Sequence, residues 1–160
     1  MPKGEEGVLG VSEALAGYRM DFREFGRLAE LRRRPDLWRY VVFAGRVAKW
    51  VADVRRKGPS GYLVSRVDFG PLAAGLADAI KTVFALEGRS RRLSLLDVNA
   101  PYLRLLMLRG RGERDPQFLP VEPVFMKLES TRLYNKEEVL SAIGQSGLND
   151  ARRGGRAGKG

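Results

Sequence analysis

The sequence contains neither cysteine nor histidine. Without thiols the protein has no disulfide framework, no thiol nucleophile and no thiolate metal site. Without imidazole it has no His-based catalytic triad and no His-ligated metal. The enzyme classes that remain are carboxylate–Mg²⁺ chemistry and Lys, Ser or Tyr chemistry with unusual activation. Phosphate-loop, zinc, haem and nucleotide fingerprints are absent as well, so we expect no cofactor, no bound metal and no catalytic residue.

Long apolar runs are also missing. No stretch reaches the roughly 18 apolar residues that a membrane-spanning helix needs. Residues 1–11 carry Glu5 and Glu6 and lack the apolar centre of a secretory signal. We therefore expect a cytoplasmic protein that does not bind membranes.

Side-chain amides are scarce, and most of the cations are arginine. This bias is typical of thermophilic proteins, in which ion-pair networks replace thermolabile residues. A GC-rich genome produces the same bias, so the sequence leaves both explanations open.

Positive charge is what the chain has in excess. Its 160 residues hold 29 Lys and Arg against 19 Asp and Glu, which gives a net charge of +10. With 44% hydrophobic residues, a chain of this length forms one domain with an ordinary core. The composition favours a protein that binds polyanions.

Two helices are predicted at the start of the domain. Asp21 and Glu24 form a capping box, which predicts a helix over residues 22–33. The apolar residues that follow recur at steps of four and three, and this spacing predicts a longer helix over residues 36–56.

The rest of the chain alternates between strands and helices. Strands are predicted over residues 62–69, 91–98, 102–109 and 121–128, with a helix from Pro71 to Gly88 and another over 136–144. The predicted fold class is α+β: two leading helices, then a four-stranded, mostly antiparallel sheet with helices packed on one face. Residues 62–98 form a β-α-β unit with one parallel crossover.

Three segments make up the predicted domain organisation. Residues 1–20 are expected to be flexible, and residues 21–146 form a single nucleic-acid-binding domain. Residues 147–160 hold almost no apolar side chains, so we expect a disordered, basic Gly/Arg tail.

Alternation along the predicted strands places rings and cations together on one open face of the sheet. The residues assigned to this face are Tyr62, Arg66, Arg92, Tyr102, Arg104, Phe125 and Lys127. Rings stack on unpaired bases, and cations follow phosphates without reading sequence, so this pattern favours single-stranded nucleic acid. The alternative is that the rings are ordinary cross-strand aromatics, half covered by a helix or a partner.

Further basic and aromatic candidates lie outside that face. Trp50 stands beside Lys49, where it is either a partly exposed ring or a hydrophobic contact. The clusters at residues 32–34 and 55–57 are explained equally well by helix dipoles and by phosphate contacts. The remaining candidates for phosphate contact are Arg91, Arg109, Arg111 and Arg114.

Asp68 and Asp97 end the first two predicted strands, which a parallel β-α-β unit places side by side. Two close carboxylates hold Mg²⁺ in phosphoryl-transfer enzymes. The alternative is that Asp68 caps the next helix and Asp97 fixes a turn.

The size, charge and predicted element order of residues 21–130 resemble those of the ThermoDBP-type single-stranded-DNA-binding proteins of hyperthermophilic archaea. The resemblance implies an open cleft with an apolar floor and a basic rim, which binds single strands without sequence preference. Members of that group can dimerise through a C-terminal leucine zipper. Here the apolar residues Val139, Leu140, Ile143 and Leu148 are too few for a coiled coil, so the question of a homodimer stays open.

The function predicted from the sequence is nonspecific binding of single-stranded DNA or RNA by phosphate electrostatics and base stacking, without catalysis. One alternative is a Mg²⁺-dependent nuclease or processing subunit that uses Asp68 and Asp97. Another is a basic structural subunit of a ribonucleoprotein or polymerase complex, whose apolar sheet docks on a partner protein.

Overall fold

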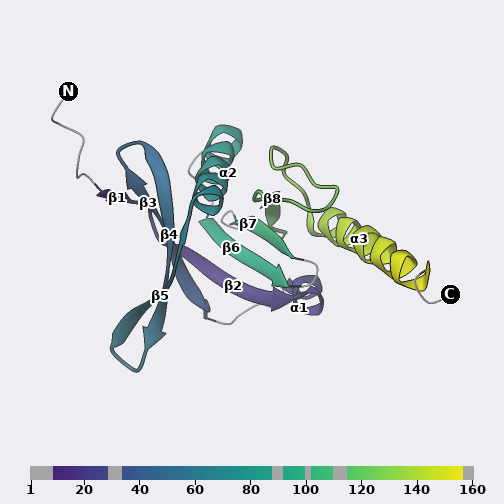
Figure 1. Ribbon diagram of the computed structural model, residues 1–160, viewed down its shortest axis with the longest axis horizontal. Helices are drawn as coiled ribbons and strands as arrows, with labels where there is room; N and C mark the ends of the chain where they lie inside the picture. The colour runs from purple at the N-terminus through teal and green to yellow at the C-terminus, as the bar shows by residue number, and fades with distance from the viewer. Residues whose placement is uncertain (1–8, 29–33, 88–91, 100–101, 110–114, 157–160) are drawn as a thin grey trace.

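The computed structural model describes residues 9–28, 34–87, 92–99, 102–109 and 115–156, with side chains up to residue 146. This part of the chain is mostly β, and one mixed sheet carries three helices (Figure 1). In chain order the elements are β1 (Leu9–Val11), β2 (Leu15–Asp21), α1 (Phe22–Gly26), β3 (Leu37–Ala44), β4 (Val47–Lys57), β5 (Gly61–Phe69), α2 (Pro71–Glu87), β6 (Arg92–Asn99), β7 (Leu103–Arg109), β8 (Gln117–Pro120) and α3 (Lys136–Arg156).

The strands lie in the order β5-β4-β3-β2-β6-β7-β8, and β1 pairs with β3 beside β2. Only β2 and β6 run parallel among these pairs; the other neighbours are antiparallel. The predicted strands over 62–69, 91–98 and 102–109 are therefore present as β5, β6 and β7. Their predicted arrangement is wrong, because β5 lies at one edge and β6 takes β2, not β5, as its parallel partner.

The second predicted helix is also wrong. Residues 36–56 form the hairpin of β3 and β4, joined by a two-residue turn at Gly45 and Arg46. Gly45 has a φ of +61°, a conformation that glycine adopts without steric cost. Valine and aromatic residues make up five of the eight residues of β3 and four of the eleven of β4, and their preference for extended backbone outweighs the helical spacing of the apolar residues. The predicted α+β fold with two leading helices is thus replaced by a mostly β fold.

The first predicted helix is present only in its first turns. The side chain of Asp21 accepts a hydrogen bond of 2.8 Å from the backbone N–H of Glu24, so the predicted N-terminus is confirmed. The helix α1 then ends at Gly26 instead of running through residue 33, and residues 29–33 lie outside the described part of the chain.

Regular structure extends further into both ends of the chain than the sequence predicts. The segment 1–20, expected to be flexible, contains β1 and most of β2. At the other end, Asn135 accepts a 2.8 Å hydrogen bond from the backbone N–H of Glu138 and caps α3 as predicted. That helix continues to Arg156, past the predicted end at residue 144 and into the stretch expected to be disordered.

The predicted strand over residues 121–128 does not form. The strand that pairs with β7 is β8, which ends at Pro120. Proline supplies no N–H to a ladder, and Pro123 follows three residues later, so pairing stops there. The chain then runs irregularly over the sheet, and Val124, Met126 and Leu128 pack against its core.

The sheet separates two hydrophobic clusters. The first lies between the sheet and α2 and includes Val41, Val51 and Leu106. The second lies on the opposite face, where α1, α3 and the irregular segment cover β2, β6, β7 and β8 with residues such as Phe25 and Phe118. Phe25 and Phe118 meet edge to face with ring centres 5.3 Å apart. No helix among the described residues is long and apolar enough to cross a membrane.

Candidate nucleic-acid interface

The strands β3, β4 and β5 present one uncovered face, which we call the outer face. Directly paired residues of antiparallel strands lie on the same side of a sheet, so the register defines its members. Trp38, Tyr40 and Val42 of β3 pair with Val54, Ala52 and Trp50 of β4. On β5 the members that pair with β4 are Tyr62, Val64, Val67 and Phe69.

The rings of the outer face are accessible to solvent. Phe69 is 68% exposed, Tyr62 71% and Trp38 38%, while Tyr40 and Trp50 are half-buried by their neighbours. Trp50 and Phe69 meet nearly perpendicularly, at 80°, with ring centres 6.4 Å apart. The outer face therefore offers both ring faces and ring edges to a planar partner.

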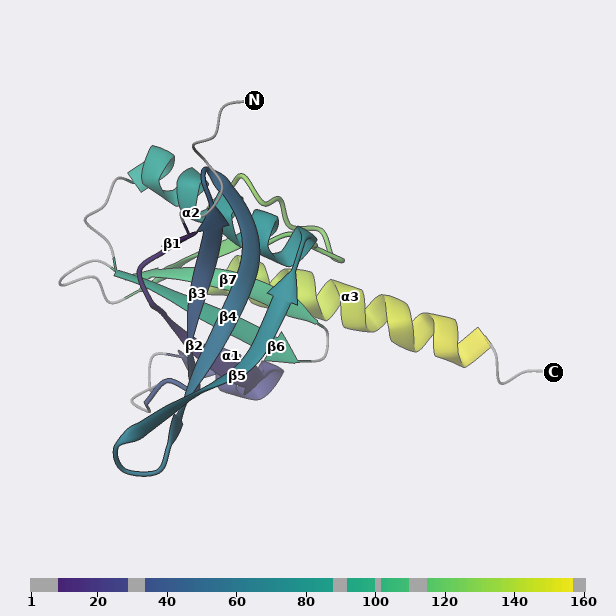
Figure 2. The same ribbon diagram turned by 60° about the vertical axis from the view of Figure 1, so that its left-hand side comes forward.

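Within the described part of the chain, no helix packs over the outer face. The helix α2 contacts β3, β4 and β5 from the opposite side, where Val41 and Val51 belong to its cluster. The helices α1 and α3 cover the same side of the sheet as the outer face, but over β2, β6 and β8. In Figure 2 the three strands lie in front with no helix drawn over them.

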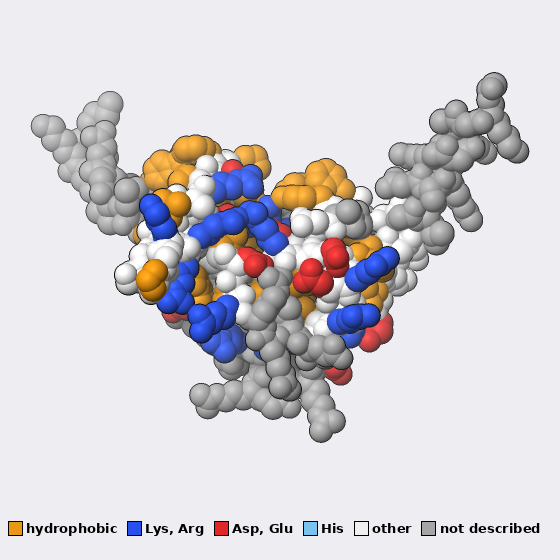
Figure 3. Space-filling model, turned by 90° about the horizontal axis from the view of Figure 1, so that it is seen from below, with side chains coloured by type: hydrophobic (Ala, Val, Ile, Leu, Met, Phe, Trp, Pro, Cys, Tyr) orange, Lys and Arg blue, Asp and Glu red, His pale blue; other side chains and the backbone are white. Residues whose placement is uncertain are grey.

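Cations stand at both ends of the long strand β4. Arg46 and Lys49 lie at the turn and bulge at its start, and Arg56 and Lys57 at its end, all with exposed side chains. Figure 3 shows Lys and Arg side chains gathered on the half of the molecule that carries these strands. At about 3.3 Å per residue, a strand of this length separates its two basic ends by roughly 33 Å.

The opposite face of the same strands holds a buried ion-pair network. Arg39 donates two hydrogen bonds to Asp53, at 2.6 and 2.8 Å, and both side chains are fully buried. Arg39 also lies 3.7 Å from Asp97, which in turn accepts a 2.8 Å bond from Arg104. The network continues from Arg104 to the hydroxyl of Tyr102.

Arginine stays charged at the centre of this network. Burial by itself lowers the pKa of Arg39, but the hydrogen bond to Asp53 and the charges of Asp97, Asp53 and Asp68 outweigh it. The pKa of Arg39 is therefore raised above its ordinary value.

The two carboxylates of the magnesium hypothesis both belong to this charged region. Asp97 is paired with Arg104, and Asp68 lies 2.7 Å from Arg66. Among the described residues there is no group of three acidic side chains that could hold a metal ion. The strands that carry Asp68 and Asp97 are not neighbours, so the predicted parallel juxtaposition is wrong.

The seven residues assigned to one open face do not share a face. Tyr62 lies on the outer face and Arg66 on the opposite side, where it pairs with Asp53 in register. Arg104 is only 5% exposed, so it belongs to the buried network and not to a surface. Tyr102 is half exposed just before β7, while Phe125 and Lys127 are exposed in the irregular segment after β8.

The other predicted contacts are divided between the outer face and a pocket. Trp50 lies on the outer face, and Arg92 and Arg109 line the pocket described next. The triplet at 55–57 ends a strand, so no helix dipole explains its charge. Arg91, Arg111 and Arg114 lie outside the described residues, as do residues 32 and 33.

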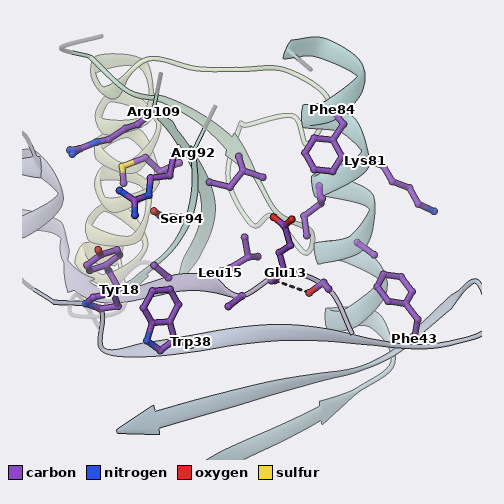
Figure 4. Close-up of a pocket in the computed structure, with 18 residues that line it drawn as sticks. Glu13, Leu15, Tyr18, Trp38, Phe43, Lys81, Phe84, Arg92, Ser94 and Arg109 are labelled. Atoms are coloured by element: carbon purple, nitrogen blue, oxygen red, sulfur yellow. Dashed lines mark hydrogen bonds between the residues drawn. The ribbon is translucent and has the colours of Figure 1, made fainter. Parts of the chain in front are cut away.

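The pocket, of about 850 Å³, lies beside the start of β2. There the chain leaves β1 at Val11 and enters β2 at Leu15, so the sheet is interrupted and the pocket has lining from both of its faces. Figure 4 shows Tyr18, Trp38, Arg92 and Arg109 on one side of it, and Phe43, Lys81 and Phe84 on the other. Trp38 belongs both to this lining and to the outer face.

Sequence reasoning missed Trp38, Tyr40 and Phe69 as members of an aromatic face. The signal was present: β-branched and aromatic residues flank the Gly45–Arg46 turn, which is typical of a hairpin. With the hairpin recognised, the period of two places Trp38 and Tyr40 on one side of β3.

No protein-family model, no curated protein and no solved structure matches the chain, so its fold and surface carry the functional argument.

Proposed function

We propose that the protein binds single-stranded nucleic acid on the outer face of β3, β4 and β5, without catalysis. The observation that carries the proposal is the uncovered aromatic surface between two basic strand ends. Unstacked bases expose planar, weakly polar ring faces, and they gain roughly 1–3 kcal/mol each by stacking on an aromatic side chain. Two tryptophans, two tyrosines and a phenylalanine share this surface.

The charge around the outer face distinguishes a nucleic acid from a protein as its partner. An exposed apolar patch also marks protein interfaces, and aliphatic residues such as Val64 and Val67 lie between the rings. Residues 34–69, which form this part of the sheet, contain eight Lys and Arg but three Asp and Glu. Two of those acids, Asp53 and Asp68, already pair with Arg39 and Arg66. The remaining cations favour a polyanion over a neutral protein partner.

Selectivity for single strands follows from the shape of the surface. A base that stacks on a ring must first leave its own stack, which costs less in an unpaired strand than in a duplex, where base pairing is lost too and the cost is a few kcal/mol. Nothing in this arrangement reads the hydrogen-bonding edge of a base. The proposed interaction is therefore tolerant of sequence.

The test is a titration of fluorescently labelled 20-nucleotide single strands, and of the matching duplex, with the whole protein and with two phenylalanine variants. Phe69→Ala removes an outer-face ring that is 68% exposed, and Phe125→Ala removes a ring that is 73% exposed but lies off the sheet. We expect Phe69→Ala to weaken binding by about 5- to 150-fold, which corresponds to 1–3 kcal/mol. Phe125→Ala is the matched control and is expected to bind normally.

Three results would contradict the proposal. Equal binding of duplex and single strands would show that charge alone acts. A normal affinity of Phe69→Ala together with weakened Phe125→Ala would place the contact on the irregular segment after β8. Self-association or no binding at all would favour the outer face as a protein interface.

A further inference from the structure

The pocket beside the start of β2 has a floor of small side chains on the side of the outer face. Ala16 pairs with Trp38 of β3 and with Ser94 of β6, and Ser94 pairs with Met107 of β7. These four residues form one row across the same side of the sheet. Because its two middle members are small, a hollow opens between the Trp38 ring and Met107.

Two arginines face each other at the rim of this hollow. Arg92 and Arg109 are directly opposite residues of β6 and β7, two positions along from Ser94 and Met107. Like charges in such a pair repel each other and destabilise a sheet. Neither arginine forms an ion pair with another residue of the described chain. The pair is therefore a place where a bound anion with two charges would relieve repulsion.

Aromatic side chains lie on the same side of the pocket as the arginines. Figure 4 shows the rings of Tyr18 and Trp38 close together below the Arg92 guanidinium, with the Ser94 hydroxyl between. Trp38 keeps 38% of its surface exposed, although it lines the pocket. A planar apolar group next to an anion is the chemistry that these side chains match.

We infer that this pocket binds the terminal nucleotide of a strand, a phosphomonoester attached to a base. The phosphate lies on Arg92 and Arg109, whose planar groups each offer two parallel hydrogen bonds. The base lies against Trp38, and Ser94 and Ala16 leave it room. The inference rests on the proposed function for the strand that leads to the pocket, because Trp38 connects the pocket to the outer face.

A terminal phosphate differs from the internal phosphates of a strand. It carries nearly two negative charges near neutral pH instead of one, and it ends the strand, so no further nucleotide has to fit beyond it. The arginine pair therefore distinguishes strand ends from strand interiors. The 5′ and 3′ phosphates share this chemistry, and the test separates them.

The first experiment measures single nucleotides, so that it does not depend on the outer face. Replacing Trp50 with phenylalanine leaves Trp38 as the sole tryptophan, because the chain has two. Quenching of Trp38 fluorescence then reports on adenosine, adenosine 5′-monophosphate, adenosine 3′-monophosphate, inorganic phosphate and octanoate. We expect one monophosphate to bind at least about 10-fold more tightly than adenosine, since hydrogen bonds to charged groups contribute 1.5–3 kcal/mol.

Arginine variants identify the phosphate contact. Arg92→Gln and Arg109→Gln should each reduce the preference for the monophosphate to less than about threefold, because half of a bidentate site is lost. Lys127→Gln, an exposed cation off the sheet, is the control and should leave it unchanged. The melting temperature of both arginine variants should be unchanged or slightly higher, because each variant removes the repulsion between two like charges.

The second experiment uses 12-nucleotide strands with a 5′ phosphate, a 3′ phosphate or no phosphate. One phosphorylated strand should bind more tightly than the bare strand, and Arg92→Gln should cancel that difference. Failure of all three strands to bind overturns the proposed function. The binding of single nucleotides, measured in the first experiment, tests the pocket independently of that result. Equal binding of adenosine and both monophosphates, octanoate binding as tightly as the monophosphates, or arginine variants that keep the full preference would overturn the inference.

Discussion

Two strands with five apolar residues each, β5 and β7, have opposite surroundings. Five of the seven residues of β7 are apolar and six of the seven are buried, because α2 packs on one side and the α1–α3 layer on the other. In β5 five of nine residues are apolar, yet none is buried. Position in the sheet, and not hydrophobicity, decides which strand becomes core. An apolar strand without a cover costs solubility, so its rings need a role other than packing.

The sharpest way to break this comparison is to remove one phenylalanine from each region. Phe118→Ala empties a fully buried site on β8, where Phe118 pairs with Met107 of β7 and its ring meets Phe25 of α1, and we expect a loss of about 3–5 kcal/mol in the free energy of unfolding. Phe69→Ala removes an exposed ring and should cost less than about 0.5 kcal/mol. Urea denaturation of both variants measures the difference. A similar cost for the two would show that the outer face is covered in solution.

The ion-pair network connects the two regions, because Arg39 and Asp53 belong to β3 and β4 and Asp97 and Arg104 to β6 and β7. Asp53→Ala leaves Arg39 buried without its bidentate partner, and we expect a loss of about 3–5 kcal/mol in unfolding free energy. The double variant Arg39→Met/Asp53→Leu removes both charges and should recover most of that loss. Thermal and urea unfolding test this. A double variant as unstable as the single one would contradict it.

The same network sets the pH dependence expected for Arg39. Its pKa is raised in the folded protein, so its stabilising effect is complete below the unfolded-state pKa and is lost only as pH rises above it. That pKa lies far above neutrality. The cost of Asp53→Ala should therefore not change through titration of Arg39 between about pH 6 and 9.

A milder substitution changes only helix α3, which covers β8. The side chain of Asn135 caps α3 by accepting a 2.8 Å hydrogen bond from the backbone N–H of Glu138. Asn135→Ala removes this bond and should cost about 1 kcal/mol in the free energy of unfolding. Binding of single strands should stay unchanged, because α3 contacts β8 and not the outer face. A loss of affinity without a loss of stability would place α3 in the interface.

The smallest expected effect concerns charge at the uncovered region. Lys49→Gln removes one exposed cation next to Trp50, and the slope of log affinity against log salt should become shallower by about 0.7. Lys127→Gln, off the sheet, should leave the slope unchanged. Titrations at three salt concentrations measure this slope. Equal slopes for the two variants would show that Lys49 does not contact a phosphate.

Local signals in the sequence predicted local structure well. Asp21, Asn135 and Pro71 each begin a helix where predicted, since a cap acts within one turn. Pairing between distant segments could not be predicted in this way. Nothing near β6 indicates that β2 is its parallel neighbour, because their register depends on the whole sheet.

The sequence predicted rings and cations on one open sheet face, and the described strands carry such a face with a different set of residues. Trp50 and Tyr62 both lie on the outer face, at opposite ends of the β4–β5 pair, where Trp50 pairs with Phe69 and Tyr62 with Arg56. Arg104 was misplaced because alternation along β7 says nothing of a second covering layer, and the two layers together bury both sides of the strand. Trp38 and Tyr40 were missed because the spacing of their neighbours also fits a helix.

The parallel pairing of β2 with β6 has a consequence for how the chain folds. The hairpins of β3, β4 and β5 join residues that are close in sequence, and hairpins form within about 1–10 μs. The pair of Ala16 and Ser94 joins residues about 80 positions apart, so its loop must close before any contact offsets the entropy. We expect the outer face to form early, and the pocket, which needs β2 beside β6, to form only when that loop has closed.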